Sequence, residues 1–176
     1  MNVYPIEAGN FKLDGGAMFG VVPKSLWTKT NPADADNMIE MSSRCMLVEN
    51  SDKLILVDTG MGDKQSEKFF KYYKRWGSDN LVKSINSAGF SIDDVTDVLL
   101  THLHFDHCGG AVAWDSSKEA YDVLFKNANY WSNEKHWDWA TSPNPREKAS
   151  FLDENLFPIK ESGQLKFINN MSKGFN

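Results

Sequence analysis

The sequence predicts an α/β fold in which a mixed sheet carries helices on one face. Two observations support this class. Short runs of β-prone apolar residues recur along the chain, and they alternate with stretches whose apolar residues lie three and four positions apart. With 176 residues, of which 41% are hydrophobic, the chain can bury one sizeable core. Residues 1–176 are therefore predicted to form a single domain.

The first sixty residues are predicted to form strands. Residues 1–40 mix short apolar runs with glycine and proline, which favours a hairpin followed by an irregular segment, with a surface loop at residues 28–37. Two further apolar runs, CMLVE at 45–49 and LILVD at 54–58, flank the turn-prone segment Asn50-Ser51-Asp52. This arrangement predicts an antiparallel hairpin.

Helices and single strands are predicted to alternate after this hairpin. Helical spacing of apolar residues indicates helices at 64–76 and 81–88, the first with aromatic side chains for the core and the second closed by Gly89. The β-prone run at 95–100 leads directly into Thr101-His102, so a strand is predicted to end at the histidines. Short strands at 123–125 and 129–131, a helix at 133–141 capped by Ser132, and a helical stretch at 146–155 complete the prediction.

Composition excludes several classes of protein. The formal net charge of −5 and the absence of a lysine- and arginine-rich patch argue against a nucleic-acid partner. No window reaches the roughly 20 apolar residues that a membrane span needs. Cys45 and Cys108 lack CxxC spacing, which favours two buried thiols over a disulfide or a zinc knuckle. We expect a cytoplasmic protein whose partner is a small-molecule substrate, with a homodimer left open.

The segment 101–110, THLHFDHCGG, carries the strongest chemical signal. It places three of the four histidines and one carboxylate within six positions, and these are groups that zinc binds. In an extended start, His102 and His104 would project to the same side and suit one ion. Asp106 and His107 are adjacent, would diverge and would suit a second ion. The alternative, ordinary histidines beside a turn carboxylate, accounts poorly for such a dense cluster.

These residues resemble those of a known family. THLHFDHCGG is similar to the HxHxDH signature of the metallo-β-lactamase superfamily, and LILVDTG resembles the strand motif that precedes it. The string HLHFDH followed by a small residue and glycine, together with the N-terminal FKLDGGAMFGVVPKSLW, is similar to the N-acyl-homoserine lactonase and organophosphate-hydrolase-like branch. The likeness extends over nearly the whole chain.

The resemblance implies a dinuclear site in an αββα sandwich, of which this chain supplies the N-terminal half. His102 and His104 would hold one Zn²⁺, Asp106 and His107 the other, and a hydroxide between the ions would attack a carbonyl or phosphorus centre. Asp106 is thus expected to be a catalytic residue as well as a metal ligand. Asp58 is expected to support the histidine loop without binding metal.

The same resemblance bears on the metal and on the substrate. His104 favours zinc-type hydrolysis, because diiron oxygen-reducing relatives usually carry Glu at that place; Mn²⁺ and Fe²⁺ stay open. Met18 and Phe19 lie in a segment that borders the metal site in relatives, so we expect them to contact substrate. His136 matches no ligand position and is predicted to be a packing or surface residue.

The chain departs from the family in one respect. A complete dinuclear site needs a further histidine, a bridging carboxylate and a last histidine, and no histidine follows His136. The chain is a fragment, a truncated relative, or one half completed by a partner. We favour a fragment, because half a sandwich would expose an apolar sheet face and an unpaired edge.

The predicted function is zinc-dependent hydrolysis of a small-molecule ester or lactone, or of a related phosphotriester or thioester. The alternative is a catalytically silent metal-binding or interaction domain whose site is incomplete.

Overall fold

A computed structural model describes residues 1–168 as a six-stranded mixed sheet with helices and a separate two-stranded hairpin. The strands of the main sheet are, in spatial order, β1 (Asn2–Asp14), β2 (Met38–Asn50), β3 (Lys53–Val57), β4 (Asp97–Leu99), β7 (Asn129–Ser132) and β8 (Leu165–Phe167). The separate hairpin is formed by β5 (Val112–Trp114) and β6 (Tyr121–Val123).

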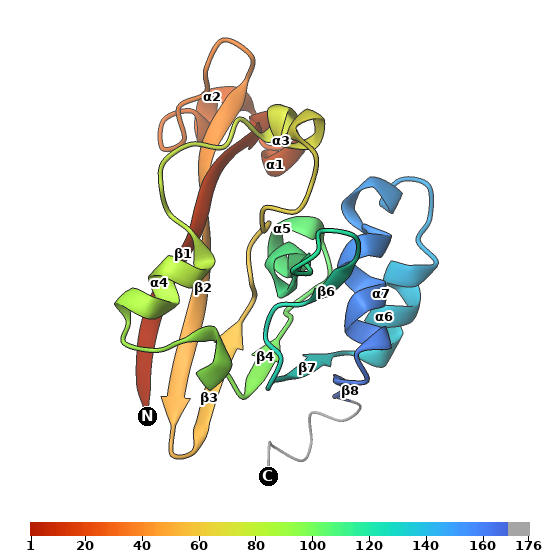
Figure 1. Ribbon diagram of the computed structural model, residues 1–176. Helices are drawn as coiled ribbons and strands as arrows, with labels where there is room; N and C mark the ends of the chain where they lie inside the picture. The colour runs from red at the N-terminus through yellow and green to blue at the C-terminus, as the bar shows by residue number, and fades with distance from the viewer. Residues whose placement is uncertain (169–176) are drawn as a thin grey trace.

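The helices occupy the connections between these strands (Figure 1). They are α1 (Gly15–Phe19), α2 (Lys24–Trp27), α3 (Glu67–Tyr73), α4 (Leu81–Ser87), α5 (Phe105–Cys108), α6 (Glu134–Thr141) and α7 (Asp153–Glu161), with short 3-10 helices at Ile92–Asp94, Gly109–Ala111 and Lys148–Ser150. None of the helices formed by residues 1–168 has the length and apolar character that crossing a membrane requires.

The N-terminal segment differs from the local hairpin that was predicted. Residues 2–14 form one long strand, β1, which pairs antiparallel with β2 along residues 38–50. A register shift between Glu7 and Asn10 interrupts the ladder, and Gly9 there has a φ of 132° that favours glycine. The prediction of a local hairpin was wrong because the partner strand is distant in sequence, and turn signals report only nearby pairing.

The predicted hairpin at 45–58 is confirmed, and the strands that follow it are parallel. β2 and β3 pair antiparallel around a two-residue turn, with Asn50 opposite Lys53. β3, β4, β7 and β8 then pair in parallel, and helices fill each connection. Because parallel strands point the same way, their carboxyl ends meet at one edge of the sheet, where α/β proteins commonly place their ligands.

One face of the sheet is covered by helices, as predicted. Leu47, Leu56, Val98 and Tyr130 are directly paired across β2, β3, β4 and β7, so their side chains form one row, and all four are fully buried. They share a single hydrophobic cluster with residues of three helices: Leu81 and Ile85 of α4, Trp137 and Ala140 of α6, and Leu156 and Ile159 of α7.

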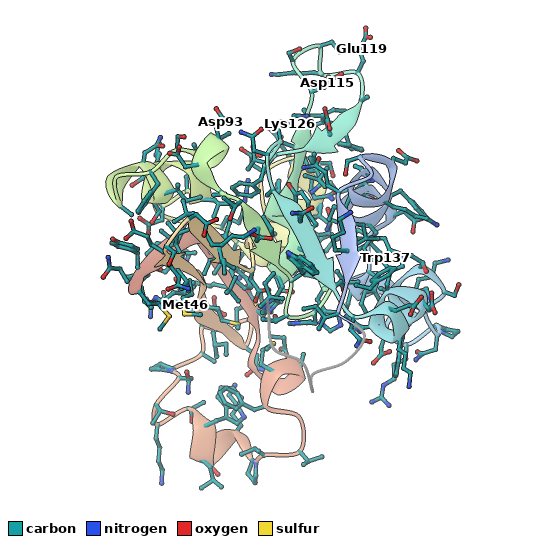
Figure 2. All side chains as sticks on the ribbon, turned by 90° about the horizontal axis from the view of Figure 1, so that it is seen from below. Met46, Asp93, Asp115, Glu119, Lys126 and Trp137 are labelled. Carbon is teal, nitrogen blue, oxygen red and sulfur yellow. The ribbon has the colours of Figure 1, made fainter. Side chains whose placement is uncertain are left out.

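The opposite face of the sheet is apolar but only partly covered by residues 1–168. Met46, Val57, Leu99 and Trp131 form the neighbouring row across the same strands. Met46 is 42% exposed and the other three are half-buried. Figure 2 shows the labelled Met46 side chain projecting from the sheet on the side away from α4. An apolar face of this kind is what the sequence predicts for half of a sandwich.

The predicted helix at 64–76 is confirmed in type but is shorter than predicted. Helix α3 ends at Tyr73, since Lys74 adopts a left-handed conformation with a φ of 40°. Trp76 therefore lies beyond the helix and is 47% exposed, so its prediction as a core residue was wrong. Phe70, by contrast, is buried in a second small cluster with Phe105 of α5.

Boundaries also differ in the last third of the chain. Ser132 still pairs with Phe167 as part of β7, and the side chain of Asn133 caps α6 instead. The predicted helix at 146–155 lies later, at 153–161, because the Asn144 side chain accepts hydrogen bonds from the backbone N–H groups of Arg146 and Glu147 and makes a turn there.

Candidate metal centre

The predicted metal ligands follow the carboxyl end of β4, and Asp58, their predicted support, follows the carboxyl end of the adjacent parallel strand β3. The two segments are joined by backbone hydrogen bonds from Asp58 N to Leu99 O (2.9 Å) and from Thr59 N to His107 O (2.8 Å). The Thr59 hydroxyl also donates to His107 O (3.0 Å). The loop after β3 therefore serves as a support for the histidine loop.

The structure gathers three imidazoles and one carboxylate at this place. The ring centroids of His102 and His104 lie 4.7 Å apart, and those of His102 and His107 lie 3.9 Å apart. Asp106 Oδ2 lies 3.6 Å from His107 Nε2. The prediction that His102 and His104 project to the same side agrees with the contact between their rings.

Asp58 binds both the strand end and the histidine loop. Its Oδ1 accepts hydrogen bonds from Thr101 N (2.8 Å) and Thr101 Oγ1 (2.9 Å), and its Oδ2 lies 2.9 Å from His107 Nδ1. This last contact places the proton of neutral His107 on Nδ1, so its Nε2 lone pair can bind a metal. A carboxylate that orients a ligand histidine in this way is a common feature of zinc sites.

The protonation of the cluster follows from burial and from these hydrogen bonds. The hydrogen bond to Asp58 raises the pKa of His107, whereas burial and then the nearby His107 and His104 lower the pKa of His102. Burial tends to raise the pKa of Asp58, but hydrogen bonds from His107 and Thr101 outweigh it, and the net pKa is below the usual value. The neutral form of His102, which binds metals, is thereby favoured.

The donor types of the four predicted ligands fit zinc, but the described residues do not present three donors to one ion. Imidazole nitrogen and carboxylate oxygen are typical zinc donors. Within residues 1–168, no three His, Cys, Asp or Glu side chains are arranged so that they could together hold one ion. The expectation that a complete site needs a further histidine and a bridging carboxylate stays a prediction.

Two glycines allow the two loops to approach each other. A Cβ atom at Gly109 would lie 2.2 Å from Met61 O, and one at Gly110 would lie 2.2 Å from Thr59 O. Real Cβ atoms do not approach backbone oxygens so closely. Gly109 and Gly110 therefore allow the backbone of the histidine loop to pack directly against the loop after β3.

Two further residues that contact the loop gave no recognisable signal in the sequence. Lys64 is 3% exposed, and its Nζ donates to Gly109 O (2.5 Å); burial lowers its pKa to about 8. His136 Nε2 accepts a hydrogen bond from Leu103 N (3.0 Å). His136 was predicted to be a packing or surface residue, and it is half-buried on α6. A lysine near a helix start and a single distant histidine have no spacing that reveals such contacts.

The N-terminal residues predicted to contact substrate lie on α1. Met18 is 45% exposed, and the ring of Phe19 stacks on Trp27, with 5.0 Å between centroids. Figure 1 shows α1 at the same end of the molecule as α3, and Phe69 and Tyr73 of α3 contact Phe105 of α5. The role of Met18 and Phe19 stays a prediction.

A cavity of about 550 Å³ lies behind the histidine loop and not at the predicted ligands. Its lining includes Asn10 of β1, Arg75 and Asp79 of the segment before α4, and Met61 and Gly110. None of the four predicted ligands lines it. The histidine loop is a better candidate for zinc chemistry, because the lining of the cavity contains aspartates but no histidine or cysteine.

Comparison with known proteins agrees with this geometry. The family described as the Metallo-beta-lactamase superfamily matches residues 39–167. An N-acyl homoserine lactonase of Bacillus cereus is 28% identical over an alignment of 104 positions, and the match covers 53% of this chain and 40% of that protein. The structure of a probable metal-dependent hydrolase from Staphylococcus aureus has a TM-score of 0.87 and 28% identity. The dizinc quorum-quenching lactonase AidC, solved in complex with a product, has a TM-score of 0.71 and 25% identity.

The alignments cover nearly all of this chain but only part of each solved relative. The alignment with the Staphylococcus aureus structure covers 99% of this chain and 61% of that one, and the alignment with AidC covers 98% and 59%. The chain thus spans about three fifths of the length of these two solved proteins. The match of residues 39–167 nevertheless includes all but the first residue of β2, and the whole of β3, β4 and the histidine loop. The chain belongs to the metallo-beta-lactamase superfamily.

Proposed function

We propose that the protein is a zinc-dependent hydrolase that opens a small-molecule lactone or ester at the histidine loop. The observation that best supports this is the gathering of His102, His104, Asp106 and His107 after the carboxyl end of β4, with Asp58 orienting His107. Lactones are favoured over other esters, phosphotriesters and thioesters because matched relatives are named N-acyl homoserine lactonase or quorum-quenching lactonase.

Each residue of the loop has a proposed role. His102 and His104 would hold one zinc ion, and Asp106 and His107 a second. Bound zinc lowers the pKa of water and polarises a carbonyl group. The Asp58 carboxylate accepts a hydrogen bond from His107 Nδ1. His107 Nε2 then faces away from Asp58 and would bind the metal.

The proposal also covers the further metal ligands, the substrate contacts, the location of the protein and its partners. The further histidine, the bridging carboxylate and the last histidine would come from a segment beyond residues 1–176. Met18 and Phe19 are apolar and would contact the apolar part of the substrate. The cytoplasmic location, a homodimer, and the lack of nucleic-acid and membrane partners stay predictions from the sequence.

A second candidate is a catalytically silent metal-binding or interaction domain. The observation that favours it is that no three His, Cys, Asp or Glu side chains within residues 1–168 are arranged to hold one ion. The two candidates differ in one respect that can be measured, since a silent domain would bind metal without turning over any substrate.

The test uses the chain extended by the segment proposed above, called the full-length protein below, stripped of metal and reloaded in turn with zinc, manganese and iron. We expect hydrolysis of N-acyl homoserine lactones to depend on metal and to exceed hydrolysis of p-nitrophenyl esters and phosphotriesters. His104→Ala should lower this activity by about a hundredfold or more, because it removes a ligand. Asp52→Asn, in the exposed β2–β3 turn, is the control and should retain activity. A zinc-loaded protein that hydrolyses none of these substrates would favour the silent domain.

A further inference from the structure

The backbone of Leu103 lies between the two histidines of the first proposed metal position, and side chains hold it on both sides. Leu103 N donates to His136 Nε2 (3.0 Å), and Leu103 O accepts from Cys108 Sγ (3.3 Å). The peptide groups that link Leu103 to His102 and to His104 are therefore each bound by a side chain. The Leu103 side chain is fully buried in the main hydrophobic cluster.

His136 is held firmly in place for this contact. It lies in the first turn of α6, where its backbone N–H donates to the capping side chain of Asn133 (3.2 Å). The following residue, Trp137, is buried in the main cluster. The His136 ring contacts Phe151 edge-on at 5.9 Å, and Phe151 also contacts the His104 ring at 4.9 Å. A fixed helix thus presents an acceptor to the histidine loop.

The contact also excludes His136 from binding a metal directly. An imidazole nitrogen that accepts a hydrogen bond uses its only lone pair. The ring must then be neutral with its proton on Nδ1, and Nε2 is not available as a ligand. Burial, and then the nearby His104, lower the pKa of His136 and favour this neutral form.

We propose that His136 is a positioning residue of the metal centre, which sets the directions of His102 and His104 by holding Leu103 N–H. This rests on the proposed function, since it requires a metal at these histidines. The physical reason is geometric: zinc–nitrogen bonds are about 2.0–2.1 Å long, so a small rotation of the backbone between two ligands moves both out of range. Without the acceptor, a buried N–H would also be left unpaired and free to reorient.

The simpler alternative is that His136 only helps α6 to pack against the loop. The two roles differ in what a replacement side chain must supply. Packing requires volume alone, whereas positioning requires an acceptor at the place of Nε2. Glutamine can put its Oε1 atom near that place, and leucine supplies volume without an acceptor.

The experiment compares His136→Leu, His136→Gln and Lys135→Ala in the full-length protein. Lys135 is exposed on the same helix and is the matched control. Three quantities are measured: zinc affinity by competition with a chromogenic chelator, the visible absorption spectrum of the cobalt(II)-loaded protein, and the unfolding temperature of the metal-free protein. Only the first two report on ligand geometry.

We expect His136→Leu to weaken binding of one zinc about tenfold to a hundredfold, the range typical of residues that orient ligands, and to change the cobalt spectrum. His136→Gln should recover most of the affinity and the spectrum, and Lys135→Ala should leave both unchanged.

Two results would overturn the proposal: unchanged zinc affinity and cobalt spectrum in His136→Leu, or equal losses in the Leu and Gln variants. The unsubstituted protein separates this failure from failure of the proposed function. If it binds no zinc or cobalt, then the metal centre itself is wrong and His136 has no such role. If it binds both while His136→Leu binds equally well, only the positioning role is wrong.

Discussion

Asp58 shows how a single residue can connect the sheet to the candidate metal centre. It follows β3 directly and has a φ of 59°, a conformation that aspartate and asparagine tolerate better than most residues. One carboxylate oxygen accepts from Thr101 at the end of the neighbouring strand, and the other contacts His107. Removing its charge without changing its shape therefore tests its support of the ligands.

We expect Asp58→Asn to weaken zinc binding about tenfold to a hundredfold. The amide can keep the backbone conformation and the hydrogen bond from Thr101, but its NH₂ group cannot accept from His107 Nδ1. Zinc affinity measured by calorimetry on the full-length protein would check this, with Asp52→Asn as a carboxylate-to-amide control. Unaltered affinity in Asp58→Asn would show that the carboxylate does not orient His107.

Among the residues of the candidate site, those that lie close together in the chain could be predicted from the sequence. His102, His104, Asp106 and His107 lie within six positions, and Asp58 follows a recognisable strand motif. His136 and Lys64 were missed as partners of the loop because each reaches it from a distant segment, over 33 and 45 positions respectively. Contacts of that kind depend on packing, which a local pattern does not report.

The carboxylate of Asp97, on strand β4, accepts hydrogen bonds that stabilise the centre of the sheet. Asp97 is 5% exposed and accepts from Trp131 Nε1 (2.7 Å), Thr96 Oγ1 (2.8 Å) and Lys53 Nζ (3.0 Å). These groups come from three segments that meet at the parallel pairs β3–β4 and β4–β7. Burial tends to raise the pKa of Asp97, but the hydrogen bonds from Trp131, Lys53 and Thr96 hold it below its usual value.

We expect Asp97→Asn to lower the free energy of unfolding by about 1–3 kcal/mol at pH 7, because the charged acceptor is lost. A carboxyl group with a lowered folded-state pKa stabilises the fold above its unfolded pKa of roughly 3.9, and this contribution is lost as the pH falls through the folded value. The difference from the unsubstituted protein should thus be constant from pH 5 to 7 and shrink below about pH 4.

Denaturant unfolding at several pH values would check the Asp97 prediction, with exposed Asp138→Asn on α6 as the control. A difference that stayed the same down to pH 3 would contradict it, since the ionised carboxylate would then not be its source.

Among the elements, those with a local signal were predicted best. The β2–β3 hairpin and helix α4 appear close to their predicted positions, because a turn and a helical repeat are properties of neighbouring residues. The pairing of β1 with β2 and the later start of α7 were not predicted. The first depends on a partner that begins more than twenty residues away, and the second on a side-chain turn at Asn144.

The whole molecule combines two features that belong together. The sheet face formed by Met46, Val57, Leu99 and Trp131 is apolar and partly exposed, and no three donor side chains within residues 1–168 are arranged to hold one metal ion. The chain also covers 59–61% of the solved relatives described above. We propose that one further segment would both cover this face and complete the site.

The central claim is that the loop 101–110 supplies metal ligands that work only in a completed site. Zinc binding decides it most directly, measured by metal analysis and calorimetry on three proteins: residues 1–176 alone, the full-length protein, and the full-length protein with His102→Ala and His107→Ala. We predict two tightly bound zinc ions for the full-length protein, weak binding by residues 1–176, and loss of tight binding in the double variant. Two zinc ions held tightly by residues 1–176, or retained by the double variant, would contradict the account.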